Sequence, residues 1–324
     1  MSPMTQNETM SAVVIDEFGG QDQLKQRDVP MPEMTADQVI VKEKAAGINP
    51  VDWKTREGYL QPMFKWPFPI ILGWDVAGVI TEVGSNVTNW KVGDRVFARP
   101  ATTRFGTYAE YTAVDANLLA PKPENISFEE AAAVPLAGLT AWQALFDHGH
   151  LQKGEKVFIH AGSGGVGSFA IQLAKSVGAY VITTTSSTNI DFVKALGADQ
   201  VIDYHETDFT EVLKDIDLVV DTIGGEAQEK SVSILKHGSG RMVSITGTAA
   251  EKTASLAENR NVRFESIWLD PNGAELTKLA NMLENGTLKV TLDSVYKFSA
   301  EGVAEAHDRS ESHHALGKIV VRFK

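Results

Sequence analysis

One stretch decides the fold of this 324-residue chain: Val157-Phe158-Ile159-His160-Ala161-Gly162-Ser163-Gly164-Gly165-Val166-Gly167. The apolar run that opens it predicts a short buried strand, and the residues after the glycines predict a helix. Its glycines have the spacing G-x-G-x-x-G, which brings bare backbone amides and a helix N-terminus up to a pyrophosphate. The stretch therefore predicts a dinucleotide site formed by Gly162, Ser163, Gly164, Gly165, Val166 and Gly167.

The glycine spacing alone also fits an ordinary loop between a strand and a helix. The sequence that follows favours the dinucleotide site, because further β-rich runs alternate with helix-like segments at 180–185, 201–203, 217–221 and 241–245. Such alternation predicts an α/β fold, a doubly wound parallel sheet of the Rossmann type, with ligands at the carboxyl ends of the strands.

Composition limits the classes of protein that the chain can belong to. The 43% hydrophobic and 22% charged residues are ordinary for a globular protein, and the length suggests two domains. A formal net charge of −12 argues against a nucleic-acid partner. No apolar run approaches the roughly 20 residues that span a membrane, and residues 1–9 lack a signal core. We therefore expect a cytoplasmic protein without a membrane or nucleic-acid partner.

The chain contains no cysteine, which excludes disulfides and thiolate metal sites. Two histidine pairs remain, His148 with His150 and His313 with His314. Neither pair has an evident carboxylate as a third ligand, so we interpret them as solvated or helix-capping residues and expect no metal site.

The sequence before the glycine turn has a different character. Short alternating runs punctuated by Gly and Pro predict a small antiparallel barrel. Ser127 and Glu130 have the spacing of a capping box, which places a helix start and a domain boundary near residue 126. Two late runs, 294–298 and 317–323, again look like barrel strands. We therefore expect a substrate domain of residues 1–125 plus 289–324, an inserted nucleotide domain of residues 126–288, and an active cleft between the two.

Several segments in this order resemble the medium-chain dehydrogenase/reductase superfamily, in its zinc-independent branch of quinone oxidoreductases and NADPH-dependent enone reductases. The resemblance covers nearly the whole chain and implies that the barrel is GroES-like. Beside the glycine turn, the segments that carry it are 46–54 (AGINPVDWK), 72–80 (LGWDVAGVI), 92–96 (VGDRV), 138–142 (GLTAW) and 196–199 (LGAD).

Two departures from the alcohol dehydrogenases of this superfamily concern the metal. This chain has Asn49 where those enzymes place a zinc-binding cysteine, and Gly73-Trp74-Asp75 where they have Gly-His-Glu. Because catalytic zinc needs about three protein ligands, metal-dependent alcohol oxidation is implausible here. The resemblance instead implies hydride transfer from NADPH to a small electrophile, a quinone or the β-carbon of an enone.

The choice of coenzyme follows from the end of the second strand of the nucleotide domain. NAD-binding folds usually carry a carboxylate there, which holds the ribose and would repel a 2′-phosphate. This chain has Ser186, Ser187 and Asn189, whose side chains can donate hydrogen bonds to phosphate, and Tyr204 matches a tyrosine of related reductases. The basic residue common in those reductases is missing, and the two serines also fit a plain polar turn. We expect NADP(H).

The resemblance also implies contacts around the nicotinamide. They involve Asn49, Thr140, Ile223, Gly224, Ile245, Trp268 and Lys318. Thr140 also fits a helix hydroxyl bonded to its own backbone, and Lys318 also fits a solvated lysine beside a strand.

Reduction of a conjugated carbonyl requires hydrogen-bond donors where negative charge develops. Asn49 is the first candidate for that donor, although an asparagine before Pro50 also fits a turn. Lys54 stands where many quinone reductases have a tyrosine. Asp52 and Lys54 either bring a charge to the cleft or form an ion pair on the barrel surface. Tyr59 is a weaker substitute for that tyrosine. We expect that no side chain is an indispensable acid and that water or a shared donor supplies the proton.

Phe64, Trp66 and Phe68 alternate in a proline-rich stretch and either wall an apolar substrate pocket or pack under a long loop.

The family resemblance implies a homodimer. A second function class stays open at this point, a non-catalytic NADPH-binding sensor or structural protein, because a fold alone does not prove activity.

Overall fold

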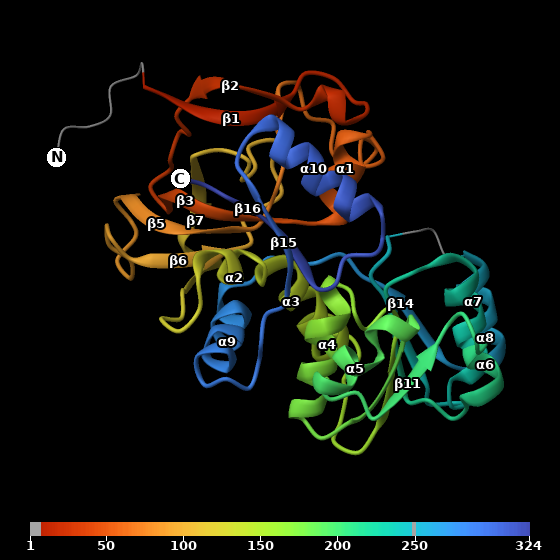
Figure 1. Ribbon diagram of the computed structural model, residues 1–324. Helices are drawn as coiled ribbons and strands as arrows, with labels where there is room; N and C mark the ends of the chain where they lie inside the picture. The colour runs from red at the N-terminus through yellow and green to blue at the C-terminus, as the bar shows by residue number, and fades with distance from the viewer. Residues whose placement is uncertain (1–7, 248–250) are drawn as a thin grey trace. The chain divides into compact units, whose positions relative to one another are not determined.

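The structure is a computed structural model that describes residues 8–247 and 251–324. The chain divides into two compact units (Figure 1). Unit 1 comprises residues 1–136, 271–286 and 290–324, and unit 2 comprises residues 137–270 and 287–289. Each unit is built around its own sheets, so the expected combination of a parallel α/β unit and a β-rich unit is confirmed.

Unit 2 contains a six-stranded sheet in the order β11-β10-β9-β12-β13-β14, and all its described pairings are parallel. From β9 the chain first adds β10 and β11 on one side and then crosses to β12 on the other. The glycine turn follows β9, at the point where the strand order reverses and open α/β sheets bind their ligands. The strands of this sheet are β9 (Lys156–Ile159), β10 (Tyr180–Thr185), β11 (Gln200–Asp203), β12 (Leu218–Asp221), β13 (Arg241–Ser244) and β14 (Arg263–Ser266).

Helices join these strands and cover the sheet. Buried β-branched and aromatic residues such as Val157, Phe158 and Val219 form the strand interiors, which explains why these runs read as apolar in the sequence. The helices of this part of the chain are α3 (Pro135–Trp142), α4 (Gly165–Ser176), α5 (Ile190–Ala195), α6 (Phe209–Val212), α7 (Gly225–Ile234) and α8 (Glu251–Arg260).

Unit 1 holds a seven-stranded sheet and a three-stranded sheet. The first has the order β15-β16-β3-β5-β6-β8, with β7 also paired to β3, and the second has the order β2-β1-β4. Its strands are β1 (Thr9–Ile15), β2 (Lys25–Pro30), β3 (Gln38–Ile48), β4 (Ile70–Ile71), β5 (Val76–Val83), β6 (Arg95–Ala98), β7 (Tyr111–Asp115), β8 (Leu119–Pro121), β15 (Leu292–Lys297) and β16 (Lys318–Arg322).

Four α-helices of unit 1 lie within residues 8–136, 271–286 and 290–324. They are α1 (Pro50–Arg56), α2 (Phe128–Ala132), α9 (Gly273–Glu284) and α10 (Ala300–Glu311). The chain passes through α10 between the parallel strands β15 and β16, and β16 then pairs antiparallel with β3, so that Ile319 lies opposite Ile48. The last strand is therefore an interior strand of the sheet, beside the segment that leads into α1.

The two units divide at different residues from those expected. The expected bounds at 125/126 and 288/289 mark where the sequence pattern changes, whereas packing assigns α2 and α9 to unit 1. A Cβ on Gly47 of β3 would lie 2.4 Å from the carbonyl oxygen of Ala132, and one on Gly273 would lie 2.3 Å from that of Asn117. Such close backbone contacts tie both helices to the sheet of unit 1. The Ser127–Glu130 capping box is present at the start of α2.

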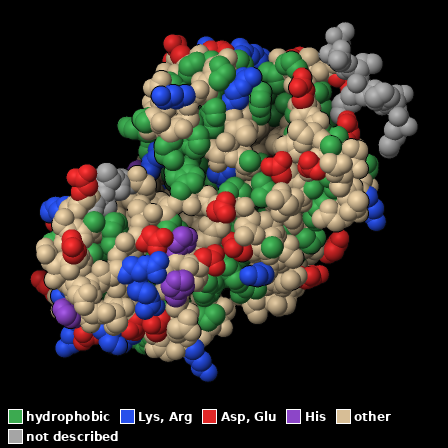
Figure 2. Space-filling view, turned by 180° about the vertical axis from the view of Figure 1, so that it is seen from behind, with side chains coloured by type: hydrophobic (Ala, Val, Ile, Leu, Met, Phe, Trp, Pro, Cys, Tyr) green, Lys and Arg blue, Asp and Glu red, His purple; other side chains and the backbone are tan. Residues whose placement is uncertain are grey.

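The surface of unit 1 carries exposed hydrophobic side chains. Figure 2 shows hydrophobic side chains gathered on the upper part of one face. Tyr59, Met63 and Phe105 are each more than half exposed. Within the described ranges, no helix is long and apolar enough to cross a membrane.

Candidate active site

The glycine turn of unit 2 has little room for side chains. A Cβ on Gly162 would lie 2.2 Å from Oγ1 of Thr183, and one on Gly167 would lie 2.3 Å from the carbonyl oxygen of Ala161. Ala161 itself has a φ of +50°. At Gly164 the nearest atom would be 3.4 Å away, so the surroundings leave this position open. Two glycines are therefore required by packing, and the third leaves bare backbone at the start of α4, as a bound pyrophosphate needs.

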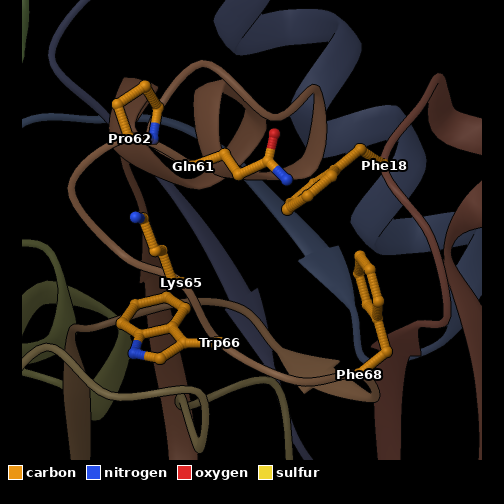
Figure 3. A pocket seen from close by; sticks show the side chains of 6 residues that line it. All are labelled: Phe18, Gln61, Pro62, Lys65, Trp66 and Phe68. Carbon is orange, nitrogen blue, oxygen red and sulfur yellow. The ribbon is translucent and has the colours of Figure 1, made fainter.

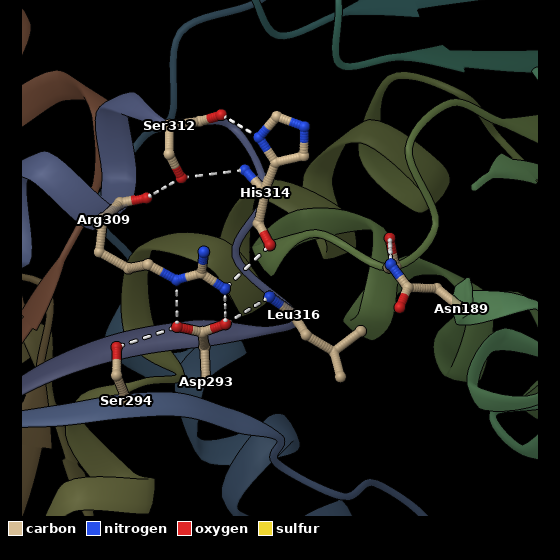
Figure 4. Close-up of polar contacts among 8 residues, drawn as sticks. Asn189, Asp293, Ser294, Arg309, Ser312, His314 and Leu316 are labelled. Atoms are coloured by element: carbon tan, nitrogen blue, oxygen red, sulfur yellow. Dashed lines mark hydrogen bonds and ion pairs between the residues drawn. The ribbon is translucent and has the colours of Figure 1, made fainter. Parts of the chain in front are cut away.

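The structure brings three of the predicted ribose-site residues together at the end of β10. Thr185 donates from Oγ1 to Oγ of Ser163 at 3.0 Å, and Asn189 lies with its Nδ2 3.5 Å from the same oxygen (Figure 4). Ser186 and Thr188 share a hydrogen bond of 2.9 Å. The side chains from Thr185 to Asn189 carry hydroxyl groups and one amide. Such groups can donate hydrogen bonds to a phosphate, whereas a carboxylate side chain at the same place could not.

Tyr204 follows β11 and lies beside this segment, because its backbone N–H donates to the carbonyl of Thr185. Its ring is half exposed and lies 4.3 Å from the His205 ring, centroid to centroid. Ser187 is exposed on the same loop. The predicted coenzyme role of Ser186, Ser187, Asn189 and Tyr204 stays a prediction, and their placement agrees with it.

The ends of β12 and β13 are tied together by Asp221, a buried residue that the sequence analysis missed. Its Oδ1 accepts from the backbone N–H groups of Ile223 and Gly224, and its Oδ2 accepts from Gln228 and Ser244. Gly224 has a φ of +78°, which only glycine adopts easily. The carboxylate thus fixes the loop after β12 at the carboxyl edge of the sheet.

Other predicted nicotinamide contacts occupy the same edge or the helix before it. The Ile245 N–H donates to the carbonyl of Asp221, directly after β13. Ile223 and Trp268 are both substantially exposed, as residues that cover a ligand would be. Thr140 lies within α3 and is nearly buried. The roles of these residues stay predictions.

Asn49 of unit 1 is buried in a polar cluster. It is 1% exposed and precedes α1, and its backbone N–H donates to Oδ2 of Asp52 at 2.8 Å. Its side-chain Nδ2 donates to Oδ2 of Asp75 at 2.8 Å, and its Oδ1 accepts from Nζ of Lys318. Lys318 also donates to the carbonyl of Ile48 at 2.8 Å. The cluster joins the end of β3, the start of α1, the start of β5 and the start of β16.

Lys318 is 4% exposed, so its interpretation as a solvated lysine is wrong. The ammonium is retained in the interior because it has three oxygen neighbours, one of them on Asp75 at 4.0 Å. Burial lowers the pKa of Lys318, and the charges of Asp75 and Asp52 oppose that shift.

The two carboxyl groups of this cluster titrate abnormally. Burial raises the pKa of Asp52 to about 7, against the hydrogen bonds from Asn49 and Tyr108. Burial likewise raises the pKa of Asp75 to about 6, against the charge of Lys318. Oδ1 of Asp52 is buried without a hydrogen-bond partner. Both carboxyl groups therefore hold a proton more tightly than a surface carboxyl does.

A chain of hydrogen bonds runs from Asp52 toward the surface. Tyr108 donates from its hydroxyl to Oδ2 of Asp52 at 2.8 Å, and Nε2 of His307 lies 3.1 Å from the same hydroxyl. Arg56 donates to Nδ1 of His307 at 3.0 Å and to Glu311 at 2.9 Å. These bonds require neutral His307 with its proton on Nε2. Burial lowers the pKa of His307 to about 3, which keeps it neutral.

Lys54 and Tyr59, two further predicted catalytic residues of unit 1, have other contacts than this cluster. The alternative of a surface ion pair at Asp52 and Lys54 is wrong, because the Asp52 carboxylate is fully buried and accepts from Tyr108 and Asn49 instead. Lys54 extends over the ring of Trp53, 5.7 Å from its centroid, and Tyr59 packs edge-on against the same ring. Tyr59 is 67% exposed.

An aromatic pocket of about 420 Å³ lies in unit 1 (Figure 3). Trp66 and Phe68 line it as expected, together with Phe18, Gln61, Pro62 and Lys65. Phe64 is not among the lining residues; it stacks on the ring of Trp66 at 4.6 Å. Both alternatives for this stretch therefore hold, for different residues. Trp66 and Phe68 line a cavity, and Phe64 packs against Trp66.

The histidine pairs have local partners. Nδ1 of His148 lies 2.7 Å from Oε1 of Glu265, a hydrogen bond that the sequence analysis missed, and the His313 ring packs edge-on against Trp53. Over residues 8–247 and 251–324, no three His, Cys, Asp or Glu side chains are grouped as metal ligands.

Two family models match the chain. One described as the alcohol dehydrogenase GroES-like domain matches residues 35–124, and one described as zinc-binding dehydrogenase matches residues 196–321. A zinc ion does not fit the residues at Asn49. The amide oxygen that would face the metal accepts from the Lys318 ammonium, and that cation already balances Asp75.

Relatives and solved structures agree on the group within the superfamily. The 2-methylene-furan-3-one reductase of Solanum lycopersicum and the chloroplastic NADPH-dependent alkenal/one oxidoreductase of Arabidopsis thaliana are each 39% identical, over 96% of this chain and 79% of the relative. The quinone oxidoreductase from Coxiella burnetii has a TM-score of 0.92 at 37% identity, covering 98% of this chain and 100% of that one.

The Escherichia coli quinone oxidoreductase complexed with NADPH has a TM-score of 0.85 at 29% identity, covering 96% of this chain and 99% of that one. All four matches extend over nearly the whole of this chain and span the two kinds of reductase that the sequence resembles. The chain therefore belongs to the medium-chain dehydrogenase/reductase superfamily, in the group of quinone oxidoreductases and NADPH-dependent alkenal/one oxidoreductases.

Proposed function

We propose that this protein is an NADPH-dependent oxidoreductase that works without a metal and reduces quinones or the C=C bond of α,β-unsaturated carbonyls. The observation that carries the proposal is the turn from Ala161 to Gly167, where packing excludes a side chain at two glycines and leaves the third open. The names of the relatives supply the acceptor classes, a 2-methylene-furan-3-one, alkenals with enones, and quinones.

The residues of unit 2 fit NADPH. The backbone from Gly162 to Gly167 would hold the pyrophosphate at the N-terminus of α4. Ser186, Ser187 and Asn189 would donate to the 2′-phosphate, and no carboxylate occupies the segment from Thr185 to Asn189. The loop after β12 that Asp221 fixes would cover the nicotinamide. Bound NADPH supplies a hydride from C4 of its nicotinamide.

In unit 1, Asn49 would donate to the acceptor's carbonyl oxygen. One of its two Nδ2 hydrogens is engaged by Asp75, which leaves the other for an oxygen on which negative charge develops. With an enone, the hydride adds to the β-carbon and the resulting enolate takes a proton at the α-carbon. With a quinone, hydride and proton together give the hydroquinone.

The proton has several possible donors in this arrangement. Lys54 and Tyr59 both lie against Trp53 near the start of unit 1's α1, and water reaches the exposed Tyr59 hydroxyl. We propose that water or a shared donor supplies this proton, so that neither residue is indispensable. Thr140 is proposed as a further contact of the carboxamide or of the substrate oxygen.

Trp66 and Phe68 are proposed to wall the acceptor pocket. Their cavity is large enough for a ring of the size of a quinone or cyclic enone, and its aromatic walls favour flat acceptors (Figure 3).

A homodimer and a cytoplasmic location are also proposed. Light scattering on the purified protein would show twice the mass of the chain, and cell fractionation would test the location.

The test is NADPH and NADH oxidation with a panel of benzoquinones, 2-alkenals and cyclic enones, each with and without a chelator. We expect turnover of at least one class, higher kcat/KM with NADPH than with NADH, and no effect of the chelator. Chelator-sensitive alcohol oxidation would contradict the metal-free assignment. Tight NADPH binding without turnover of any acceptor would favour the non-catalytic alternative.

A further inference from the structure

The side-chain amide of Asn49 is engaged at both ends. Its Nδ2 donates to Oδ2 of Asp75 at 2.8 Å, and its Oδ1 accepts from Nζ of Lys318. All three side chains are buried, with exposures of 1%, 0% and 4%. The orientation of the Asn49 amide is therefore fixed by Asp75 and Lys318.

The two neighbours permit only one orientation of the amide. Rotation about the last side-chain bond of asparagine is soft and two-fold, so an unconstrained amide exchanges its oxygen and nitrogen easily. An ammonium can only donate and a carboxylate can only accept. A flipped Asn49 would place its NH₂ group against Lys318 and its oxygen against Asp75, and both hydrogen bonds would be lost.

Lys318 is held in this place by the sheet. It is the first residue of β16, and the next residue, Ile319, lies opposite Ile48 of β3. Its Nζ also donates to the Ile48 carbonyl. The preceding segment is fixed by Asp293, which accepts from the Leu316 N–H at 2.8 Å and from Arg309 at 2.8 and 2.5 Å (Figure 4).

The charges around the amide are few. Asp75 faces Lys318 at 4.0 Å and accepts from the Leu136 N–H at 2.8 Å. Asp52 and Arg99 are the other buried charged groups that act on this pair. The Lys318 ammonium therefore has two roles. It balances the charge of the Asp75 carboxylate, and it donates a hydrogen bond to the amide oxygen of Asn49.

We propose that Lys318 is a positioning residue for the reduction step: together with Asp75 it orients the Asn49 amide so that the free Nδ2 hydrogen faces the acceptor's carbonyl oxygen. The proposal rests on the proposed role of Asn49 as the donor to that oxygen. It replaces the expected direct contact between Lys318 and the coenzyme with an action through Asn49.

A double-mutant cycle between the two residues tests the proposal. Lys318→Met, Asn49→Ala and the double variant would be compared in kcat, with NADPH affinity measured separately by its fluorescence. Loss of a donor to developing charge costs on the order of 100-fold in kcat, which we expect for Asn49→Ala. We expect about tenfold for Lys318→Met alone, and less than about twofold further loss when it is added to Asn49→Ala. NADPH affinity should stay unchanged in Lys318→Met.

A second variant covers the case in which Lys318→Met leaves Asp75 unpaired and does not fold. The variant Lys318→Met/Asp75→Asn removes both charges of the buried pair and keeps an acceptor oxygen at residue 75. It should fold, as circular dichroism and thermal unfolding would show, and still lose about tenfold in kcat because the Asn49 oxygen lacks its donor. Lys297→Met, at an exposed lysine of the neighbouring strand β15, is the matched control and should leave kcat unchanged.

Three results would overturn the inference. Equal losses from Lys318→Met in both backgrounds would show that the lysine acts independently of Asn49. A weaker NADPH affinity with unchanged kcat would show a direct coenzyme contact. Full activity of Asn49→Ala toward every acceptor would remove the role of Asn49 itself, so that the proposed donor, and not only its positioning, would fail.

Discussion

The buried carboxyl of Asp52 gives a quantitative prediction about stability. Its pKa is about 7 in the folded protein, against an ordinary 3.8. At about 1.36 kcal/mol for each pKa unit, the difference corresponds to about 4 kcal/mol. Because the pKa is raised, the folded state binds the proton more tightly than the unfolded state. The cost is therefore absent below about pH 4 and fully present above about pH 7.

The change Asp52→Asn removes this titration and keeps an acceptor oxygen for Tyr108 and for the Asn49 N–H. The free energy of unfolding of the variant, minus that of the wild type, should rise by about 4 kcal/mol between pH 4 and pH 8. Taking the difference between the two proteins cancels the titrating groups that do not interact with Asp52. Asp75, whose charge acts on Asp52 and whose pKa is about 6, contributes to the difference in the same pH range.

Urea unfolding at a series of pH values, followed by tryptophan fluorescence, measures this difference. Four of the six tryptophans, residues 53, 66, 74 and 90, belong to unit 1 with Asp52, so the signal reports the unit that changes. Asp16→Asn, which neutralises a surface carboxylate paired with Arg27, is the matched control and should show no comparable trend. A difference that stays constant from pH 4 to pH 8 would refute the reasoning.

Four further substitutions test the proposed coenzyme and acceptor sites. Gly167→Ala should lower both the melting temperature and NADPH affinity, because its Cβ would lie 2.3 Å from a backbone oxygen, whereas Gly164→Ala should keep the melting temperature and lose only affinity. Equal thermal losses in the two variants would contradict this account. Ser187→Asp should shift the ratio of kcat/KM for NADPH over NADH by about tenfold or more toward NADH, because a carboxylate repels the 2′-phosphate. An unchanged ratio would place the phosphate elsewhere. Trp66→Ala should raise KM for flat bicyclic acceptors several-fold with little change in kcat, and an equal effect on small alkenals would argue against a ring-binding wall.

The strands and the coenzyme turn could be predicted because their signals are local. The apolar run before Gly162, the spacing of the glycines and the capping box at Ser127 each lie within a few residues of one another. Local steric and hydrogen-bond rules decide such features, whatever the rest of the chain does. The resemblance to known reductases added Asn49, and the structure gives this residue a polar setting that the sequence does not display.

The partners of Asn49 could not be predicted from their spacing. Asp75 and Lys318 are separated from it by 26 and 269 positions, and only the pairings of β3 with β5 and β16 bring them together. Tyr108 and His307 likewise meet through packing of distant segments. A lysine at the start of a strand looks solvated unless the strand is known to be an interior one, which is why that interpretation of Lys318 was wrong.

The interior position of β16 also orders the assembly of the protein during synthesis. The sheet of unit 1 lacks the interior strand between β15 and β3 until residues 318–322 have left the ribosome, whereas the described strands of the parallel sheet of unit 2 are complete by residue 266. The lysine that fixes the Asn49 amide arrives with that last strand. A nascent chain therefore completes the parallel sheet of unit 2 before it can form the polar cluster of Asn49, Asp75 and Lys318.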